Sequence, residues 1–258
     1  MSTKYPGGVI SSTAPAPSGS FQTSIASGVW TMEQAAHFTK QGNWPTPGNV
    51  APPSTIGQAY GGGYYAGKIT DGGVGYYIIV APKATGENTS LAWKTTSAAG
   101  PSGVQTLTNG PASTLAMFNA GSTLYPAATY CHNLSIGGFT DWYLPARDEL
   151  EVVYRSFKPT TTANDTGARP GGDGLVYGTN ANSIPAGAAY TAGSPAQTAV
   201  AKYITVSGTE AFTATFYWSS TEFTATTAAW FQSFGGGAQF YNNKVYTNYV
   251  RAVRRLII

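Results

Sequence analysis

The clearest alternation of apolar and polar positions lies in residues 137–157, which read GGFTDWYLPARDELEVVYRSF. The first half is an aromatic cluster that ends at Pro145, a residue suited to the first turn of a helix. From Ala146 onward, apolar residues recur at i, i+3, i+4 and i+7, namely Leu150, Val153, Tyr154 and Phe157. This spacing predicts a core helix with one apolar face, and on its other side Glu151 precedes Arg155 by about one turn.

Shorter patterns predict further elements on both sides of this helix. Asp71 and the two glycines after it form a hairpin signal, and the continuous apolar run Tyr76–Val80 that follows predicts a central strand. Gly235–Gly237 predicts another hairpin turn, and Tyr249–Ile258 predicts a final strand. The segment Pro126–Leu134 predicts a second helix, because proline begins it and a glycine pair follows its end.

Residues 158–215 have weak periodicity and are rich in Gly, Ala, Ser, Thr and Asn. A connection of this length between well-marked elements is unusual. It is either a functional loop system or an insertion docked on the domain. We therefore assign residues 57–258 to one domain with a long loop region at 159–215.

Residues 1–56 form a different kind of segment, extended and rich in Pro, Gly, Ser and Thr. A capping box at Thr31 and Gln34 predicts one short helix within it. Such a helix is not stable alone, so Trp30 and Trp44 on its flanks should dock on another surface. That surface belongs either to another subunit, which makes the segment an attachment arm, or to the chain's own domain, which makes it a brace.

The composition narrows the class of protein. Only 10% of the 258 residues are charged, 13% are aromatic and 32 are glycine, with a net charge of +3. This mixture is typical of β-rich extracellular or virion proteins, and it offers no basic patch for nucleic acid. Cys131 is the only cysteine, so an intrachain disulfide and a multi-cysteine zinc site are excluded, and we expect a buried thiol within a helix.

The N-terminus lacks the apolar core of a signal peptide, and no run reaches transmembrane length. We therefore expect no insertion into a membrane. If the protein acts outside a cell, the expected route is assembly into a particle in the cytoplasm and release by lysis.

Two motifs near the N-terminus carry a resemblance. Gly28–Thr31 reads GVWT and Gly42–Pro45 reads GNWP. This pattern is similar to N-terminal segments of bacteriophage structural proteins, especially tail-fibre-like and decoration proteins. The resemblance implies that the segment joins the chain to other virion proteins.

Five ordered motifs carry a second resemblance, which covers roughly residues 57–258. They are GGGYYAGKI, GGFTDWYLPARDELEVVYRSF, FYWSSTE, AWFQSF and YVRAVRRL, with Lys244 standing before the last. In this order they resemble the C-terminal domain of collagen-like bacterial adhesins. The resemblance implies an α+β, C-type-lectin-like fold with two helices, antiparallel sheets and neighbouring domain ends. Tyr76–Val80 and Val250–Leu256 are then the expected pair of terminal strands.

The residues do not predict an enzyme, a metal site or a cofactor. A glycosidase needs two carboxylates across a cleft, whereas Asp148, Glu149 and Glu151 are helix neighbours and predict a solvated or ion-paired surface. His37 and His132 lack a motif-placed partner and a metal-ligand spacing. The Glu-Pro-Asn, Gln-Pro-Asp and Trp-Asn-Asp tripeptides of calcium lectins with this fold are absent from the chain.

Several motif residues are expected to be structural, and their carboxylates should pair with Arg251 or Arg254. These residues are Asp141, Trp142, Trp218, Glu222 and Trp230.

The predicted ligand-binding segment is QFYNNKVYTN at 239–248, because Tyr and Asn recur in recognition loops. In C-type-lectin-like receptor binders of phages, the segment before the last strand is part of the ligand-binding face. The predicted contact residues are Gln239, Tyr241, Asn242, Asn243, Tyr246 and Asn248. The alternative is an ordinary exposed hairpin. A second candidate set in the long loop consists of Tyr177, Asn180, Asn182 and Tyr190.

Together these features predict a bacteriophage virion protein of a tail fibre or tip, in which a homotrimer binds a host glycan or outer-membrane component. A head or tail decoration protein and a secreted bacterial adhesin are the alternatives.

Overall fold

The computed structural model describes residues 3–5, 8–10, 52–223 and 227–258. The chain divides into two units, Met1–Pro52 and Pro53–Ile258. In the first unit, β1 (Thr3–Tyr5) and β2 (Gly8–Ile10) pair as antiparallel strands. The predicted short helix and its flanking residues Trp30 and Trp44 lie outside the described residues.

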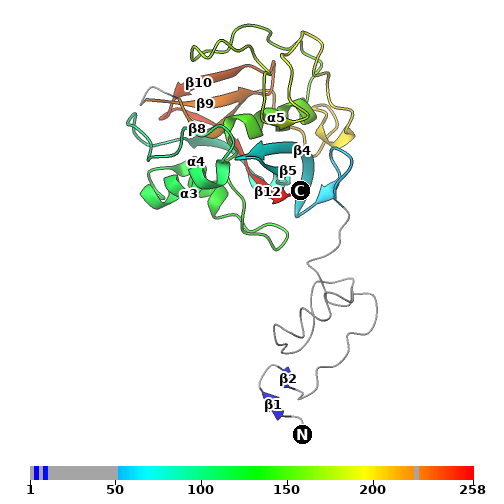
Figure 1. The fold of residues 1–258 in the computed structure, drawn as a ribbon, viewed down its shortest axis with the longest axis vertical. Coiled ribbons are helices and arrows are strands. Elements are labelled where there is room, and N and C mark those ends of the chain that lie inside the picture. Colours follow the sequence, from blue (N-terminus) through cyan, green and yellow to red (C-terminus); the bar gives the residue numbers. More distant parts are fainter. Residues whose placement is uncertain (1–2, 6–7, 11–51, 224–226) are drawn as a thin grey trace. The chain divides into compact units, whose positions relative to one another are not determined.

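Two β-sheets form the frame of the second unit (Figure 1). The first has the spatial order β10 (Gln239–Asn243), β9 (Ala228–Ser233), β8 (Phe216–Glu222), β11 (Thr247–Arg251) and β6 (Glu87–Ala92). Its neighbours are antiparallel except β8 and β11, which are parallel. The second has the order β12 (Val253–Ile257), β5 (Val74–Val80), β4 (Gly63–Asp71) and β3 (Ala59–Tyr60), with β7 (Ser183–Ile184) added to β4.

The predicted pairing of the terminal strands is confirmed. Val253 lies opposite Val80, and Ile257 lies opposite Tyr76 in the antiparallel pair of β12 and β5. The predicted hairpin turn is also present between β4 and β5, where Gly72 and Gly73 have φ values of 57° and 84°. A two-residue turn of this kind requires positive φ at both positions, which glycine adopts without a Cβ clash.

The described residues contain four α-helices, which with the sheets confirm the predicted α+β class (Figure 1). They are α2 (Lys83–Gly86), α3 (Gly110–Ala120), α4 (Pro126–His132) and α5 (Arg147–Phe157), and a short 3-10 helix, η1, spans Ala201–Tyr203. The two predicted helices are α4 and α5, so the predicted number was too low. Helix α3 was missed because its apolar residues form no single stripe; it begins where Asn109 Oδ1 accepts a hydrogen bond from the Ala112 amide at 3.1 Å.

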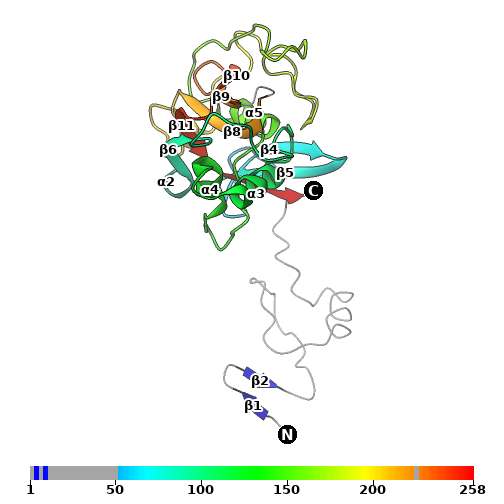
Figure 2. The same ribbon diagram turned by 90° about the vertical axis from the view of Figure 1, so that its left-hand side faces the viewer.

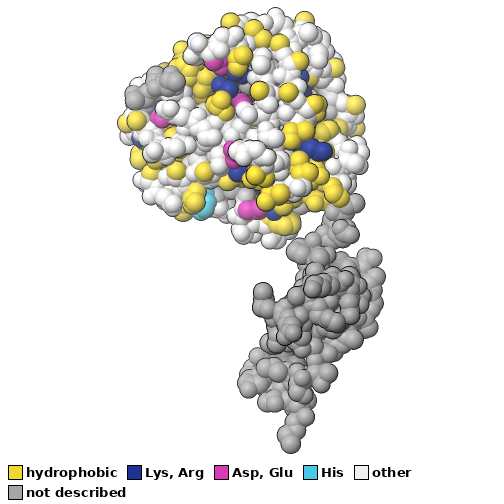
Figure 3. Space-filling model, viewed as in Figure 1, with side chains coloured by type: hydrophobic (Ala, Val, Ile, Leu, Met, Phe, Trp, Pro, Cys, Tyr) yellow, Lys and Arg dark blue, Asp and Glu magenta, His cyan; other side chains and the backbone are white. Residues whose placement is uncertain are grey.

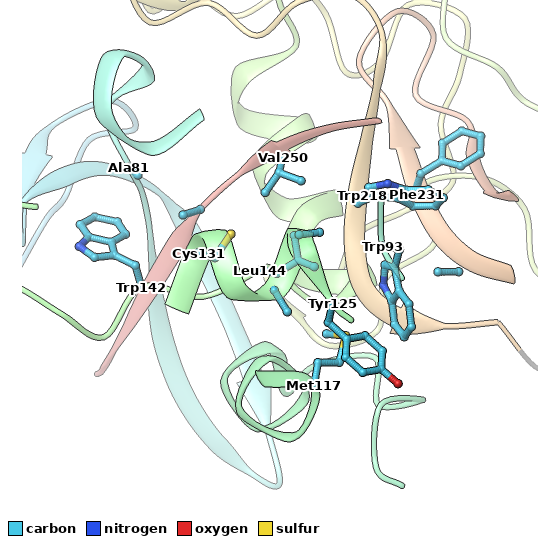
Figure 4. Close-up of a cluster of buried hydrophobic side chains, with 14 of the residues drawn as sticks. Ala81, Trp93, Met117, Tyr125, Cys131, Trp142, Leu144, Trp218, Phe231 and Val250 are labelled. Atoms are coloured by element: carbon cyan, nitrogen blue, oxygen red, sulfur yellow. The ribbon is translucent and has the colours of Figure 1, made fainter. Parts of the chain in front are cut away.

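The buried apolar side chains form two clusters. The first lies among α3, α4 and the strands of both sheets, and Figure 4 shows the ring of Trp93 close to that of Tyr125 in it. The two rings are edge-on, with centroids 5.7 Å apart. Cys131 of α4 is buried here as expected, and burial raises the pKa of its thiol. The second cluster lies beneath α5 and includes Tyr154, Phe157 and Phe234.

The long loop is docked on α5, as expected of an insertion packed on the domain. In both ribbon views the loop lies on the α5 side of the domain, away from α3 and α4 (Figure 1; Figure 2). Asn180 Nδ2 donates to Glu151 Oε2 at 2.8 Å, and Tyr190 Oη donates to Glu151 Oε1 at 2.9 Å. These contacts bury the polar side of the helix as well as its apolar side.

The expectation of a solvated acidic surface on α5 is therefore wrong, although the expected ion pairs are present. Asp148, Glu149 and Glu151 are all buried. Asp148 pairs with Arg147 at 3.0 Å, and Glu151 pairs with Arg155 at 2.9 Å. Burial removes water from these carboxylates, which therefore need partners within the fold.

Candidate functional site

The turn between β10 and β11 is fixed against the segment that follows β6. Ser97 Oγ donates to Asn243 Oδ1 at 2.9 Å, and the Lys94 amide donates to the Lys244 carbonyl at 3.1 Å. Asn243 also closes the turn, because its carbonyl accepts the Tyr246 amide at 3.1 Å. Tyr246 remains 59% exposed. The turn thus presents an aromatic side chain from a backbone that the scaffold holds.

Beside the turn, three stacked rings form what we call the aromatic ridge: Phe223, Tyr241 and Phe240. The ring of Tyr241 lies 3.9 Å from that of Phe223 at an interplanar angle of 13°, and 5.1 Å from that of Phe240 at 10°. Phe240 is 41% exposed, and the other two are partly exposed. The ridge therefore offers flat apolar area at the edge strand β10.

The ridge rests on buried side chains from several elements. Trp230 of β9 lies opposite Tyr241 and presents its ring edge-on to both Tyr241 and Phe223, at 6.4 and 5.3 Å. The Arg147 guanidinium lies 4.9 Å from the Trp230 ring, and its burial lowers the pKa of Arg147. Gly171 of the long loop has φ of 111°, and a Cβ there would lie 3.3 Å from the Phe223 ring. Close packing on this side leaves the rings little room to change their orientation.

An open depression of about 610 Å³ lies beside the turn, where Lys244 contacts its lining residue Glu222. Its wall is formed by segment 99–106, and Glu222 at the end of β8 is the charged side chain that lines it. Glu222 Oε1 accepts hydrogen bonds from the Gly100 amide and from Lys244 Nζ. Glu222 and Phe223 are consecutive, so one backbone segment serves both the depression and the ridge.

Two buried ammonium groups accompany this carboxylate. Lys94 Nζ and Lys244 Nζ both donate to the Ala98 carbonyl, at 3.3 and 3.1 Å. Each also lies over an aromatic ring, Lys94 at 5.2 Å from Tyr125 and Lys244 at 4.8 Å from Trp93. Burial lowers the pKa of Lys244, while its ion pair with Glu222 opposes that shift. Glu222 therefore has a cationic partner within the fold, on its Oε1.

The predicted contact residues of segment 239–248 divide into two groups. Tyr241, Asn242 and Asn243 are partly exposed and Tyr246 is exposed, so these four remain in the candidate set. Gln239 is fully buried; its Oε1 accepts hydrogen bonds from Arg169 Nη1 at 3.1 Å and the Gly178 amide at 3.2 Å. Asn248 is also buried. Gln239 and Asn248 therefore leave the set on which a surface site can be built.

The second candidate set is used mainly inside the fold. Asn180 and Tyr190 are buried in the contacts with α5 described above. Asn182 Nδ2 donates to Asp148 Oδ2 at 2.8 Å, and Tyr177 is partly exposed. These side chains hold the loop on the helix.

The predicted pairing of motif carboxylates is correct for one residue and wrong for another. Asp141 accepts two hydrogen bonds from Arg254, at 2.7 and 2.8 Å. Glu222 pairs with Lys244 instead of an arginine. Arg251 pairs with Glu87 and Glu210, two acids that carry no motif signal.

Arg251 and Arg254 lie in the segment predicted as one final strand, and both are buried. Ala252 interrupts the predicted strand, so that β11 ends at Arg251 and β12 begins at Val253 in the other sheet.

Sequence reasoning missed Phe223, Phe240 and the depression. Phe223 follows the FYWSSTE motif directly and Phe240 lies within the predicted segment, so their positions were a usable signal. The depression has no local signal, because segment 99–106 and Glu222 are far apart in the sequence.

In the part of the chain that the structure describes, no group of three or more His, Cys, Asp or Glu side chains is placed to hold a metal ion. No helix in the same residues is both long and apolar enough to cross a membrane. His132 stacks on Phe118, with ring centroids 4.0 Å apart.

Comparison with known proteins gives one family. The family model described as Lcl C-terminal domain matches residues 84–254, which include α3, α4, α5, the long loop and both sides of the site. A search of curated proteins found no match.

Proposed function

The chain belongs to the Lcl C-terminal domain family, and we propose that its lectin-like domain binds a host cell surface non-covalently through the aromatic ridge and the β10–β11 turn. The observation that carries the proposal is the stack of Phe223, Tyr241 and Phe240 at an exposed sheet edge. Exposed aromatic rings held by a rigid scaffold are unusual unless they contact a partner, because they expose apolar area to water.

The surface chemistry favours a glycan or another neutral outer-membrane component as the partner. Charged side chains are few on the face drawn in Figure 3, where much of the surface is neutral. The ridge supplies apolar area for the flat face of a sugar ring. Asn242 and Asn243 at the end of β10 supply amide Nδ2 groups that donate to its hydroxyl groups, while the Oδ1 of Asn242 accepts the Asn243 amide and that of Asn243 accepts Ser97 Oγ. Binding of this kind requires no catalytic group, and we propose no enzymatic activity.

We further propose that the protein is a component of a bacteriophage particle, at a tail fibre or tip. The resemblance of Gly28–Thr31 and Gly42–Pro45 to phage structural proteins supports this assignment. Residues 1–56 would then join the particle through Trp30 and Trp44. Assembly as a homotrimer would present three weak sites together, and multivalent contact raises avidity without new interactions at each site.

Two other functions remain open to experiment. A decoration protein on a head or tail would carry the same domain as a projecting structural part. A secreted bacterial adhesin would use it on a bacterial surface. Gold-labelled antibody on intact particles separates them: label at fibre tips supports host attachment, label over the capsid supports decoration, and no label on particles supports the secreted adhesin.

Binding of the fluorescently labelled protein to host cells tests the site. We expect Tyr241→Ala and Asn242→Ala to reduce cell binding strongly. Tyr60→Ala, which removes a partly exposed tyrosine from β3 of the other sheet, serves as the matched control. Unchanged binding by both ridge-side variants would remove this surface from the proposal.

Deletion of residues 1–45 tests the proposed arm. We expect a folded domain that no longer enters the particle. Loss of folding, measured by circular dichroism, would instead identify the segment as a brace on its own domain.

A further inference from the structure

The depression beside the β10–β11 turn has the size of a small-molecule site. Its volume of about 610 Å³ lies within the range of about 300–1,000 Å³ that ligand pockets occupy. The side chains with hydrogen-bonding groups along it are Ser102, Gln105, Thr106 and Glu222. Three of these four are neutral.

Glu222 is the side chain with unused binding capacity. It is 7% exposed, and both hydrogen bonds that it accepts from described residues fall on Oε1. Among the described residues no donor reaches Oε2, and this oxygen is not one of the atoms sealed from solvent without a partner. A carboxylate oxygen accepts hydrogen bonds readily and strengthens them by its charge. A ligand that enters the depression therefore meets an open, charged acceptor.

The surrounding charges decide what kind of donor suits this acceptor. A cation would come close to the ammonium groups of Lys94 and Lys244, which converge on the Ala98 carbonyl. An anion would meet Glu222 Oε2. A neutral hydroxyl group avoids both repulsions and donates to Oε2, while Ser102 and Gln105 can serve neighbouring hydroxyl groups.

We propose that the depression is a subsite for a neutral hexose, in which a sugar hydroxyl donates a hydrogen bond to Glu222 Oε2. This inference rests on the proposed function and deepens it by naming the ligand class. Glu222 is followed by Phe223 of the aromatic ridge, and Ser97 joins the same segment to Asn243 of the turn. An oligosaccharide with one residue in the depression can thus continue across the turn or toward the ridge.

Titration of the 15N-labelled full chain with methyl α-D-glucoside, methyl α-D-galactoside and methyl α-D-mannoside tests the subsite directly. We expect at least one of them to cause saturable shifts of the amides of Gly100, Gly103 and Thr106. Putrescine and inorganic phosphate serve as cationic and anionic probes. Shifts with either ion and none with the hexosides would overturn the proposal, as would a complete absence of shifts at these amides.

The same spectra separate this proposal from the proposed function. Hexoside shifts confined to Tyr241, Asn242 and Tyr246 would overturn the subsite while leaving host binding through the ridge in place. Hexoside binding in the depression by a protein that does not bind host cells would support the subsite and count against the proposed function.

Two variants test the residues involved. Ala99→Trp places a bulky side chain at an exposed position of the lining, and Ala120→Trp makes the same change at an exposed position of α3. The bulky side chain of the first variant should keep a hexoside from reaching Glu222. We therefore expect it to weaken hexoside affinity by about tenfold or more, which is the factor for a lost hydrogen bond to a charged acceptor. The second variant should leave the affinity unchanged. Wild-type affinity in Ala99→Trp would overturn the proposal even if Glu222→Gln, which alters the pair with Lys244, fails to fold.

Discussion

Helix α5 and the aromatic ridge use polar and aromatic residues in opposite ways. The helix carries five charged residues among eleven, and four of them are buried against the long loop and the sheets. The segment that forms the turn, Gln239–Asn248, has one charged residue, Lys244, and this residue is buried too. Its exposed side chains are uncharged. In these two regions, charge therefore belongs to the framework, and neutral aromatic and amide groups belong to the surface.

This division has a physical reason. With only 10% charged residues, the chain places most of its described ion pairs where they join distant segments. Breaking a buried ion pair costs much stability, because the partner that remains is a buried charge without solvation or compensation. Variants on the two sides of the division should therefore differ sharply in their effect on stability and on binding.

The largest loss of stability is expected for Arg251→Met. Arg251 donates to the Ala81 carbonyl at 2.7 Å, to Glu87 at 3.1 Å and to Glu210 at 2.8 Å. Removing it leaves two buried carboxylates without their main cation, which costs about 3–5 kcal/mol. Urea denaturation followed by tryptophan fluorescence measures this change in the free energy of unfolding.

Lys83→Met is the matched control for that experiment. The Lys83 side chain is one-third exposed and lies 3.7 Å from Glu87. Its Nζ also donates to the Ala211 carbonyl at 2.6 Å. Because Glu87 keeps its pair with Arg251 when Lys83 is replaced, the expected loss is only about 1 kcal/mol. Equal losses for the two variants would contradict the assignment of stability to buried charges.

A pH dependence follows from Glu149, which is buried near Tyr143, Arg255 and Asp71. Burial raises the pKa of Glu149 from 4.5 to about 7, against the opposing effects of the Ala146 amide and Arg255. Between these two pH values the folded protein holds a proton that the unfolded chain releases. Stability therefore falls as pH rises through this window and is constant with respect to this group above it.

Glu149→Gln removes this titration while keeping an oxygen for the Ala146 amide. Relative to the variant, the wild type should lose up to about 3 kcal/mol of stability between about pH 4 and about pH 8. Urea denaturation of both proteins across this range gives the difference. Parallel stability curves would show that Glu149 does not titrate in the window.

The framework elements that the sequence predicted are those with a local signal. The 3.6-residue period of Leu150, Val153, Tyr154 and Phe157 identifies α5, and the glycine pair after Asp71 identifies the hairpin. What local patterns could not reveal is the burial of the polar side of α5. That burial depends on Asn180 and Tyr190, which reach the helix from the long loop.

A smaller loss is expected for Asn180→Ala, which breaks this contact between loop and helix. Asn180 Nδ2 donates to Glu151 Oε2 and to the Asp148 carbonyl, and the variant leaves both oxygens short of a donor. The expected loss is about 1–3 kcal/mol, with faster protease cleavage inside residues 159–215. Thr166→Ala, at an exposed position of the same loop, should change neither quantity. Unaltered cleavage in Asn180→Ala would mean that other contacts hold the loop.

The site was predictable only in part for the same reason. Tyr241, Asn242, Asn243 and Tyr246 were found because the segment between two motifs carries a run of Tyr and Asn. Gln239 belongs to the same run but is buried by Arg169 and Gly178 of the long loop. Glu222 lies in a motif that indicated structure, and its second role depends on a wall supplied by segment 99–106. Contacts between distant segments decide which residues of a motif reach the surface.

The smallest change in stability, with a clear effect on binding, is expected for Tyr246→Ala. The side chain projects from the turn and is 59% exposed, so its removal should alter the free energy of unfolding by no more than about 0.5 kcal/mol. If the turn contacts the host surface, cell binding should nevertheless fall, because an aromatic side chain at a contact contributes area at low entropic cost. Arg251→Met should show the opposite behaviour: the domain unfolds more easily, and binding is lost only when it is unfolded. Cell-binding assays of both variants below their melting temperatures measure this contrast. Full cell binding by Tyr246→Ala would confine recognition to the ridge and the depression, since the turn would then act only as the support that holds Asn243 against Ser97.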